Sequence, residues 1–360
     1  MHKFKEVPLN FASLAKADSG KEGGEQMAAG SRKKKQPIRA GIDIGTKRVR
    51  VYIESEGIVF DEPCILAIDQ KGQTLAIGDQ AWQMRGLSDD QLQIIRPFEN
   101  GKVRLNILNA FLEQLCLDCG IFRLFRRSVI AVSYPTMLSD EAAEAIRDWL
   151  MDLGADKVYF DREILFSALG SRINLNAPVA SCIMNIGHEN CEIAAFARSK
   201  MISRSAFSIN GAAVSRQIDG WLRDTQQISV SEETVEAIKE NLGGFQMVVM
   251  PKAMEIFGIS LATGNFESLV VDENQIAVQL APVLREWAGW ITGFLSSLEP
   301  ADQQDIAARG IVACGGCLKL NGLAGSLQKL CGIPIYCADE PSLTVVAGLQ
   351  TLLQKLDPQA

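Results

Sequence analysis

Residues 41–52 read Gly-Ile-Asp-Ile-Gly-Thr-Lys-Arg-Val-Arg-Val-Tyr, and this stretch decides the fold. The pattern predicts a strand that ends in a tight Gly-Thr turn and returns as a strand with alternating apolar residues. Such a turn suits a polyphosphate, because Gly45 lets a ligand approach the backbone, Thr46 can donate its hydroxyl and Asp43 can hold Mg²⁺ through water. An ordinary hairpin in a β-rich domain has the same pattern, so a matching second half of the chain must decide between these interpretations.

Length and composition indicate a globular protein of two domains. The chain has 360 residues, of which 47% are hydrophobic and 22% are charged, so a large core is expected. The net charge of −7 argues against a nucleic-acid partner. No apolar run reaches the roughly 18 residues of a membrane span, and the first residues lack a secretory signal. We therefore expect a cytoplasmic protein.

Nine cysteines, an odd number within apolar runs, are typical of reduced thiols rather than of a disulfide framework. Two Cys-x-x-Cys pairs, Cys116/Cys119 and Cys314/Cys317, have the spacing of zinc half-sites. The first pair lies in a helical pattern, and the second brackets two glycines after a buried strand. Packing thiols are therefore favoured over zinc ligands.

The chain divides into a tail and two similar halves. Residues 1–37 contain the runs Gly-Lys-Glu-Gly-Gly-Glu and Ser-Arg-Lys-Lys-Lys-Gln-Pro and few large apolar residues, which predicts a mostly disordered tail. Strand–turn–strand patterns begin at residues 38 and 180, and each leads into alternating helices and strands, which implies duplicated domains. The predicted parts are domain I at 38–177 with an insert at about 59–95, domain II at 178–339 with an insert at about 212–279, and a helix at 340–356 that returns to domain I.

Period and flanking residues predict the individual elements. The predicted strands are 38–53 with its turn, 57–69, 74–77, 128–132, 157–160, 180–186, 192–197, 200–208, 310–313 and 334–336. The predicted helices are 79–86, 106–118, 141–153 with Ser139 as its N-cap, 162–169, 211–222, 231–241, 276–298, 321–330 and 341–356.

The second half repeats the first turn. Residues 182–196 read Cys-Ile-Met-Asn-Ile-Gly-His-Glu-Asn-Cys-Glu-Ile-Ala-Ala-Phe, so that Asn185 matches Asp43 and Gly187 matches Gly45. A third turn follows the apolar run at 310–314, where Gly315 and Gly316 precede a helical pattern. Paired glycines let backbone approach an adenine ring or a phosphate closely. Three glycine turns in this order favour a nucleotide-binding protein.

With these motifs the chain resembles the actin/heat-shock chaperone/sugar-kinase ATPase superfamily, and most closely the MreB-like bacterial actins, over about residues 38–356. The resemblance rests on residues 41–46, 57–63, 96–101, 236–239, 309–316 and 338–341. It implies an α/β, actin-like ATPase fold in which two duplicated RNase-H-like domains surround a nucleotide cleft. It also implies ATP or ADP as the ligand, with Mg²⁺ as its metal.

The resemblance assigns roles to individual positions. Those in the two phosphate loops are Asp43, Gly45, Thr46, Lys47, Asn185, Gly187 and His188; those toward the adenosine are Glu236, Lys239, Gly315 and Gly316. Glu163 falls where the family keeps the glutamate that orients the attacking water, although the proline that usually follows is Ile164 here.

The second phosphate loop departs from the family, which has Asp-Ile-Gly-Gly-Gly-Thr where this chain has Asn-Ile-Gly-His-Glu-Asn at 185–190. Asn185 removes a negative charge near the metal and cannot accept a proton. A positive φ at His188 would cost roughly 1 kcal/mol or more, and Glu189 places a carboxylate near the phosphates. Nucleotide binding is therefore expected, whereas ATP hydrolysis stays open.

A loop between a helix and a buried strand suggests a membrane contact. Residues 120–128 alternate apolar side chains (Ile121, Phe122, Leu124 and Phe125) with arginines (Arg123, Arg126 and Arg127). An apolar loop that enters a bilayer, with arginines on anionic headgroups, accounts for both kinds of residue. In MreB-like proteins a Leu-Phe pair at this place has that role. The alternative is a helix end that packs inward while its arginines extend to solvent.

The resemblance implies a cytoskeletal protein that polymerises, or co-assembles with a related bacterial actin, at the inner face of the cell membrane. It would help to determine cell shape together with the cell-wall elongation machinery. The damaged second loop leaves open a non-hydrolysing scaffold paralogue. A small-molecule kinase of the same superfamily is a third alternative, but such kinases usually add substrate loops that we do not find here.

Overall fold

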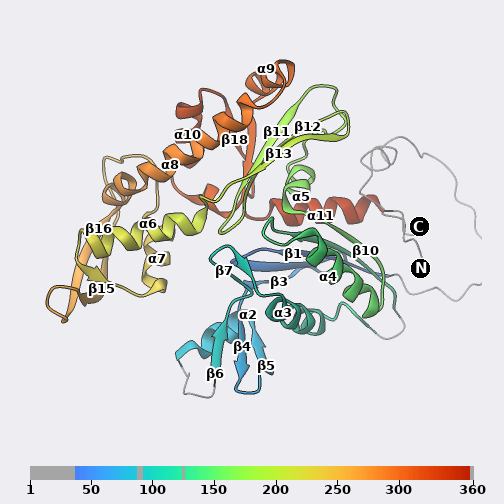
Figure 1. Ribbon diagram of the computed structural model, residues 1–360, viewed down its shortest axis with the longest axis horizontal. Helices are drawn as coiled ribbons and strands as arrows, with labels where there is room; N and C mark the ends of the chain where they lie inside the picture. Colours follow the sequence, from blue (N-terminus) through green and yellow to red (C-terminus); the bar gives the residue numbers. More distant parts are fainter. Residues whose placement is uncertain (1–36, 87–91, 124–125, 357–360) are drawn as a thin grey trace, which may run out of the picture. The chain divides into compact units, whose positions relative to one another are not determined.

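The computed structural model describes residues 37–86, 92–123 and 126–356, so the predicted tail lies almost entirely outside the described residues. The described chain forms two compact units (Figure 1). Unit 1 contains residues 37–178, 197–200 and 345–356, and unit 2 contains residues 179–196 and 201–344.

Unit 1 is built on a five-stranded sheet of order β10-β9-β1-β2-β3. Its strands are β1 (Ile38–Ile44), β2 (Arg48–Ile53), β3 (Gly57–Pro63), β9 (Ser128–Tyr134) and β10 (Ala155–Arg162). Strands β1, β9 and β10 are parallel, whereas β1, β2 and β3 form an antiparallel meander. The parallel strands therefore end at one common edge of the sheet.

Helices cover both faces of this sheet. They are α3 (Leu105–Asp118), α4 (Asp140–Asp152), α5 (Glu163–Gly170) and α11 (Thr344–Lys355). One core joins the sheet to apolar residues of α3 and α4, and a second core joins it to α5 and α11. The C-terminal helix packs closely here, because a Cβ on Gly41 would lie 3.0 Å from the Cβ of Leu349. The chain's last helix thus packs on the sheet of unit 1.

A small insert follows β3, with a sheet of order β5-β4-β6. Its elements are β4 (Leu66–Asp69), β5 (Thr74–Ile77), α2 (Gly78–Gln83), the 3₁₀ turn η2 (Met84–Gly86) and β6 (Leu92–Ile95), followed by the hairpin β7 (Phe98–Glu99) and β8 (Lys102–Val103). The prediction of one strand over 57–69 is wrong. The chain leaves the main sheet at Cys64 and pairs next with β5 and β6, so two strands belong to two sheets.

Unit 2 repeats the connectivity of unit 1. Its main sheet has the order β13-β12-β11-β17-β18, and its strands are β11 (Ser181–Ile186), β12 (Cys191–Ala197), β13 (Lys200–Ala206), β17 (Ile311–Cys314) and β18 (Ile335–Cys337). Read from β3, the first sheet has the order β3-β2-β1-β9-β10, with the same pairing directions. The predicted duplicated α/β fold is confirmed.

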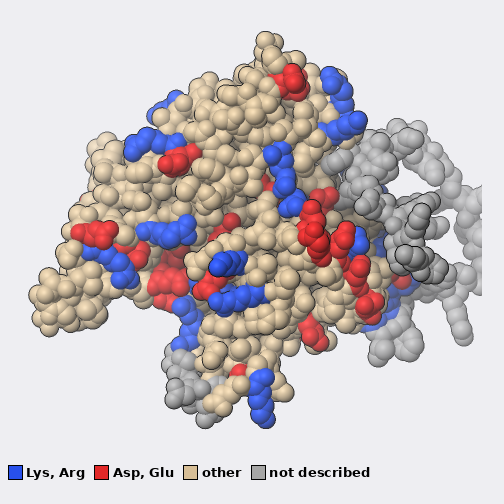
Figure 2. All heavy atoms as spheres, viewed as in Figure 1, with Lys and Arg blue, Asp and Glu red and all other residues tan. Residues whose placement is uncertain are grey.

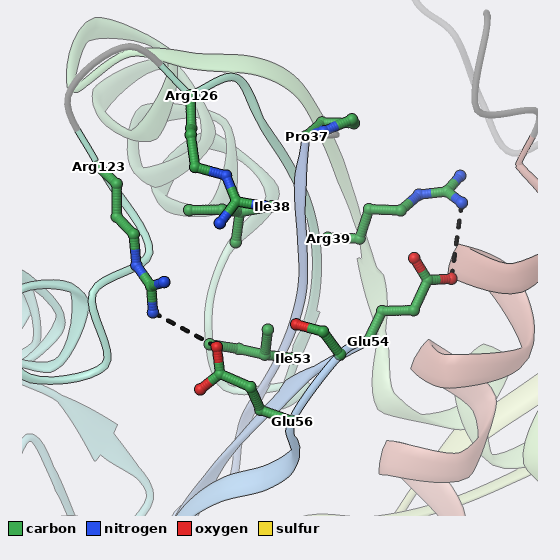
Figure 3. A pocket seen from close by; sticks show the side chains of 9 residues that line it. Pro37, Ile38, Arg39, Ile53, Glu54, Glu56, Arg123 and Arg126 are labelled. Carbon is green, nitrogen blue, oxygen red and sulfur yellow. Dashed lines mark hydrogen bonds and ion pairs between the residues drawn. The ribbon is translucent and has the colours of Figure 1, made fainter. Parts of the chain in front are cut away.

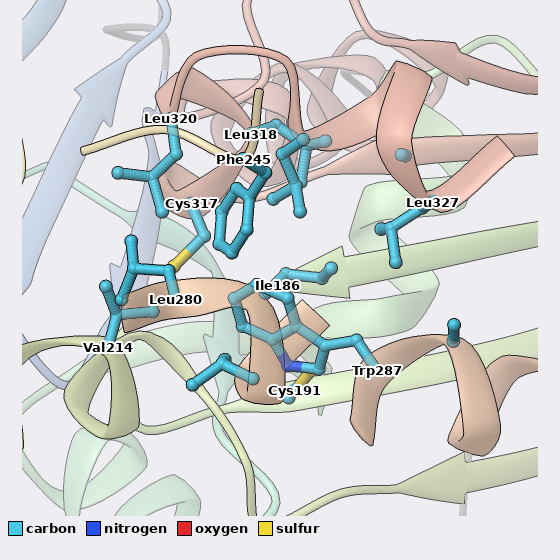
Figure 4. Close-up of a cluster of buried hydrophobic side chains, with 14 of the residues drawn as sticks. Ile186, Cys191, Val214, Phe245, Leu280, Trp287, Cys317, Leu318, Leu320 and Leu327 are labelled. Carbon is cyan, nitrogen blue, oxygen red and sulfur yellow. The ribbon is translucent and has the colours of Figure 1, made fainter. Parts of the chain in front are cut away.

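The helices of unit 2 are α6 (Gly211–Asp224), α7 (Glu232–Leu242), α8 (Glu273–Ser296), α9 (Pro300–Arg309) and α10 (Leu323–Cys331), with the 3₁₀ turn η3 (Gly316–Lys319). A second sheet contains β14 (Ile228–Ser229), β15 (Ala253–Ser260) and β16 (Phe266–Asp272). Trp287 of α8 is fully buried among Val214, Phe245 and Leu280 (Figure 4), and its indole donates to the Ile209 carbonyl over 2.7 Å.

Candidate functional site

A row of polar residues crosses the whole sheet of unit 1 at one register. Its members, from β10 to β3, are Asp161, Ser133, Asp43, Arg50 and Asp61. Residues directly opposite each other on paired strands point to the same face. We call this set the polar row; it lies near the ends of the parallel strands, next to the Gly45 turn.

Asp43 is buried within the polar row. The Ser133 hydroxyl donates to its Oδ1 over 2.7 Å, and Arg50 Nη1 lies 3.6 Å from its Oδ2. Burial raises the pKa of Asp43, although the Arg50 cation and the Ser133 hydroxyl partly offset this rise. Only 4% of residue Asp43 is exposed, and its carboxylate already has a cation and a hydroxyl donor as partners.

Arg50 is shared between two carboxylates. Its Nε lies 3.2 Å from Asp61 Oδ1, and Arg48 Nε donates to the same oxygen over 2.7 Å. Burial opposes ionisation of Asp61, but the hydrogen bonds and charges of the two arginines outweigh it and lower the pKa of Asp61. Asp43 and Asp61 are therefore bridged by one guanidinium.

These residues do not fit the expected magnesium site. Mg²⁺ prefers oxygen ligands, namely water molecules and carboxylates, and it balances the negative charge of the carboxylates. Here Arg50 occupies the neighbourhood of Asp43, and the matching position of unit 2 is the neutral Asn185. No group of three or more His, Cys, Asp or Glu side chains suited to a metal occurs within residues 37–86, 92–123 and 126–356. The Arg50 cation beside Asp43 therefore argues against a magnesium ion held by this carboxylate.

The two predicted turn glycines share a structural reason. A Cβ on Gly45 would lie 2.4 Å from the Arg48 carbonyl oxygen, and one on Gly187 would lie 2.7 Å from that of Asn190. In both hairpins, the carbonyl three residues ahead fills the space that a side chain would need. Thr46 is buried and Lys47 half-buried in the first turn, where the Lys47 carbonyl accepts from Cys64 N over 2.9 Å.

His188 does not have a positive φ, so the conformational cost considered for that case does not arise. The non-glycine residues with positive φ in the described chain are Asn100, Arg172, Arg198, Ser199 and Gln227. His188 is half-buried, and its carbonyl accepts from Ala212 N over 2.7 Å. The hairpin therefore accommodates histidine and Glu189 without the backbone strain that the sequence suggested.

In unit 2 the predicted positions converge through direct contacts. Gly315 has φ +96°, and a Cβ on it would lie 2.4 Å from Asn185 Oδ1. Lys239 Nζ donates to the Gly211 carbonyl over 2.7 Å, and Gly211 N donates to the Gly187 carbonyl over 2.9 Å. Gly316 starts η3, and a Cβ on it would meet no described atom within 4 Å. The second hairpin, the glycine pair and α7 are thus joined around the start of α6.

Lys239 is committed to protein contacts. Besides the Gly211 carbonyl, its buried ammonium lies 3.0 Å from Ser215 Oγ and 3.5 Å from Glu236 Oε1. Glu236 in turn accepts a hydrogen bond from the Ser215 hydroxyl. The Glu236–Lys239 pair lies on one helix face, as its spacing predicts, and Ser215 was not identified from the sequence.

The start of α6 is closed by the protein itself. Gly211 N and Ala212 N donate to the carbonyls of Gly187 and His188, and Ala213 N donates to Asn210. A free helix N-terminus is a common phosphate site. Here these donors are already used, which the sequence did not reveal because the hairpin acceptors lie more than 20 residues away.

The polar row has a counterpart in unit 2 with altered charges. Asn185 lies opposite Glu192 on β12 and opposite Cys314 on β17. Glu192 is fully buried and pairs with Arg204 over 2.8 Å. The first sheet therefore pairs an acid, Asp43, with a base, Arg50. At the same positions, the second sheet pairs a neutral amide, Asn185, with an acid, Glu192.

Glu163 begins α5 immediately after β10, at the edge where the parallel strands of unit 1 end. Its side chain is buried, with 5% of the residue exposed. Asp161, two residues earlier, belongs to the polar row. Glu163 thus lies at the same edge of the sheet as Asp43, while its role in orienting water stays a prediction.

The structure corrects part of the predicted membrane loop. Ile121 is fully buried in the core of unit 1, and Phe122 packs against the same core, so the assignment of Ile121 to a bilayer contact is wrong. Leu124 and Phe125 lie outside the described residues. Arg127 forms an ion pair with Asp156, and Arg123 Nη2 lies 3.4 Å from Glu56 Oε1.

A pocket of about 220 Å³ adjoins this segment (Figure 3). It is lined by Pro37, Ile38, Arg39, Ile53, Glu54, Ser55, Glu56, Arg123 and Arg126. Arg39 Nη1 lies 3.6 Å from Glu54 Oε1, so acids and arginines in the pocket largely compensate each other. The cavity is therefore polar and mixed in charge.

On the face shown in Figure 2, acidic and basic side chains are interspersed.

Among the described residues, no helix has both the length and the apolarity that a membrane crossing requires. Cys116 lies in the last turn of α3 and Cys119 directly follows that helix, whereas Cys314 ends β17 and Cys317 lies in η3; Cys116, Cys314 and Cys317 are buried. Burial raises the pKa of Cys116 to about 12.

Comparison with known proteins gives a family match over nearly the whole folded chain. A family model described as MreB/Mbl protein matches residues 38–360. The cell shape-determining protein Mbl of Bacillus cereus is 25% identical over 319 residues, which cover 88% of this chain and 96% of that protein. The cell shape-determining protein MreB of Haemophilus influenzae is 28% identical over 328 residues, covering 88% and 93%.

Solved structures show the same fold at low identity. MreB5 of Spiroplasma citri bound to AMPPNP has a TM-score of 0.80 and 20% identity, and the match covers 87% of this chain and 94% of that one. The MamK double helical filament has a TM-score of 0.72 and 16% identity, covering 89% and 100%.

Proposed function

The chain belongs to the MreB/Mbl family, and from this premise we propose that it binds ATP or ADP, assembles into filaments and helps to determine bacterial cell shape at the membrane. The observation that carries the proposal is the duplicated sheet. Each unit has the same strand order, and each has a glycine turn after its central strand. Loops at the carboxyl ends of parallel strands are the usual place for ligands in such sheets.

Each unit has a candidate phosphate turn of its own. Unit 1 offers the Gly45-Thr46-Lys47 turn, and unit 2 offers the contacts that join Asn185, Gly187 and Gly315. Relatives of the fold support a nucleotide ligand, because MreB5 of Spiroplasma citri was solved bound to AMPPNP and to ADP. Glu236 and Lys239 are proposed to face the adenosine.

Filament formation is proposed by analogy with the MamK double helical filament. Contact with an anionic membrane is proposed for the segment that contains Leu124 and Phe125, with Arg126 nearby. Partners in cell-wall elongation follow from family membership alone. The protein would then lie at the inner face of the cell membrane.

A second candidate function is a non-hydrolysing scaffold that co-assembles with an active bacterial actin. The specific observation in its favour is Asn185, which cannot act as a base or add charge near the phosphates. Glu163 keeps a carboxylate at the edge of unit 1, so hydrolysis is not chemically excluded. Nothing among the described residues favours the small-molecule kinase.

Sedimentation of the full-length protein tests the proposal. Samples contain ATP, ADP or no nucleotide, with and without phosphatidylglycerol vesicles, and phosphate release is measured in parallel. Pelleting that depends on nucleotide supports self-assembly. Pelleting only when a related bacterial actin is added, without phosphate release, supports the scaffold. A protein that binds no nucleotide and pellets in no mixture contradicts both.

A further inference from the structure

We propose that Arg50 replaces the divalent cation beside Asp43, so that this protein binds its nucleotide without Mg²⁺. The inference rests on the proposed nucleotide binding and adds to it the charge that compensates the phosphates. The position beside Asp43 that a metal would need is taken by the Arg50 guanidinium. Both residues belong to the sheet of unit 1, which fixes their contact.

Strand register makes the Asp43–Arg50 contact a built-in feature. The two residues are direct partners on β1 and β2, and Arg50 is also the direct partner of Asp61 on β3. Their side chains are 6%, 14% and 36% exposed for Asp43, Arg50 and Asp61, so the ion pairs lie mostly away from solvent. A mobile surface arginine could swing away, whereas one held between two carboxylates stays in place.

A metal near Asp43 would meet this positive charge. Arg50 Nη1 lies 3.6 Å from Asp43 Oδ2, and Ser133 donates to Oδ1, so both oxygens already have a partner. A divalent cation held through water would lie within a few ångströms of a guanidinium that cannot lose its proton. Like charges at such distances repel strongly in a mostly buried site.

The first hairpin carries enough positive charge for phosphate. Over residues 43–50, Lys47, Arg48 and Arg50 give three positive charges against the one negative charge of Asp43, which leaves a net charge of +2. Guanidinium groups match phosphate oxygens in geometry and are weakly hydrated.

The test measures the affinity of a fluorescent ATP analogue for the full-length protein, in excess Mg²⁺ or in excess EDTA. For the wild type we expect the two dissociation constants to agree within about threefold. Arg50→Leu frees Asp43 for a metal, so its affinity should fall by at least about tenfold on chelation. Arg50→Lys keeps the charge and should stay insensitive to EDTA.

Arg48→Leu is the matched control. Arg48 lies on the same strand two residues away, and its ion pair is with Asp61 rather than with Asp43. Its loss removes one positive charge from the hairpin, so affinity should fall equally in Mg²⁺ and in EDTA, and binding should stay insensitive to chelation. Thermal unfolding of each variant shows whether it folds, and the wild-type comparison decides the proposal even if Arg50→Leu does not fold.

Three outcomes overturn the inference, and they are distinguishable. Wild-type affinity that falls tenfold or more in EDTA shows a metal-dependent site and leaves the proposed function intact. Wild-type and Arg50→Leu proteins that are equally insensitive to EDTA remove the role of Arg50. Absence of binding in both buffers contradicts nucleotide binding itself, and with it the proposed function.

Discussion

At the scale of single residues, glycine at positions 45 and 187 is required by the fold of each hairpin and also shapes the candidate site. Glycine turns are usually explained by positive φ, but neither residue is among the glycines with positive φ. Both are required because a backbone carbonyl occupies the place of a Cβ. The nearby carbonyl therefore excludes a side chain at both positions, and this leaves the space at each turn that a ligand would use.

Gly187→Ala tests this constraint. The new Cβ would lie 2.7 Å from the Asn190 carbonyl oxygen, and backbone cannot move aside cheaply. We expect a loss of about 1–3 kcal/mol in the free energy of unfolding, as for other overpacked sites. Chemical denaturation followed by circular dichroism measures it.

Gly220→Ala is its control. Gly220 lies inside α6, where an added Cβ would meet no atom within 4 Å, so alanine should stabilise the protein by up to about 1 kcal/mol. Equal stability of the two variants would show that the close approach at Gly187 carries no cost.

At the scale of elements, local signals placed most helices and missed two strands of unit 2. Ser139 caps α4 as predicted, and its hydroxyl accepts from Ala142 N over 3.2 Å. Helix α8 begins at Glu273, earlier than the predicted 276, because Asp272 and Gln275 form a capping box. Strands β15 and β16 were not predicted, since exposed apolar residues such as Phe257 and Phe266 blur the alternation of half-buried strands.

Ser139→Ala should destabilise the protein by about 1 kcal/mol, because the first turn of α4 loses a hydrogen-bond acceptor. Ser139→Thr keeps a hydroxyl and should cost only a few tenths of that amount. The midpoints of urea unfolding of the two variants, compared with wild type, measure the difference. Identical midpoints for alanine and threonine would mean that water replaces the cap.

At the scale of the whole molecule, the duplication explains why two weak motifs became a strong prediction. A single Gly-Thr turn has many interpretations, but the same turn in the same strand order of both units specifies one fold. The duplicated sheets have nevertheless diverged in charge, with Asp43–Arg50 in one and Asn185–Glu192 in the other. The two sheets share one fold, whereas the charges beside their turns differ from each other.

Within the predicted membrane loop, Leu124 and Phe125 are expected to contact the membrane, whereas Ile121 belongs to the core. The double variant Leu124→Ser with Phe125→Ser should reduce co-sedimentation with phosphatidylglycerol vesicles and leave thermal unfolding nearly unchanged. Ile121→Ser instead removes a fully buried side chain and should cost about 2–5 kcal/mol of stability. Undiminished vesicle binding by the folded double variant would contradict the membrane role.

The sequence by itself determined the duplicated α/β fold, the turn glycines, the cap of α4 and the family, because each of these depends on local pattern and order. The tertiary structure alone decided that Arg50 pairs with Asp43, that Ser133 lies 90 residues from the carboxylate it contacts and that Ile121 belongs to the core. The physical reason is strand register. Register sets which side chains lie opposite each other, and a pattern along the chain does not contain it. Thus the sequence predicted Asp43 as a ligand for a metal, whereas the structure places the Arg50 guanidinium of β2 beside it.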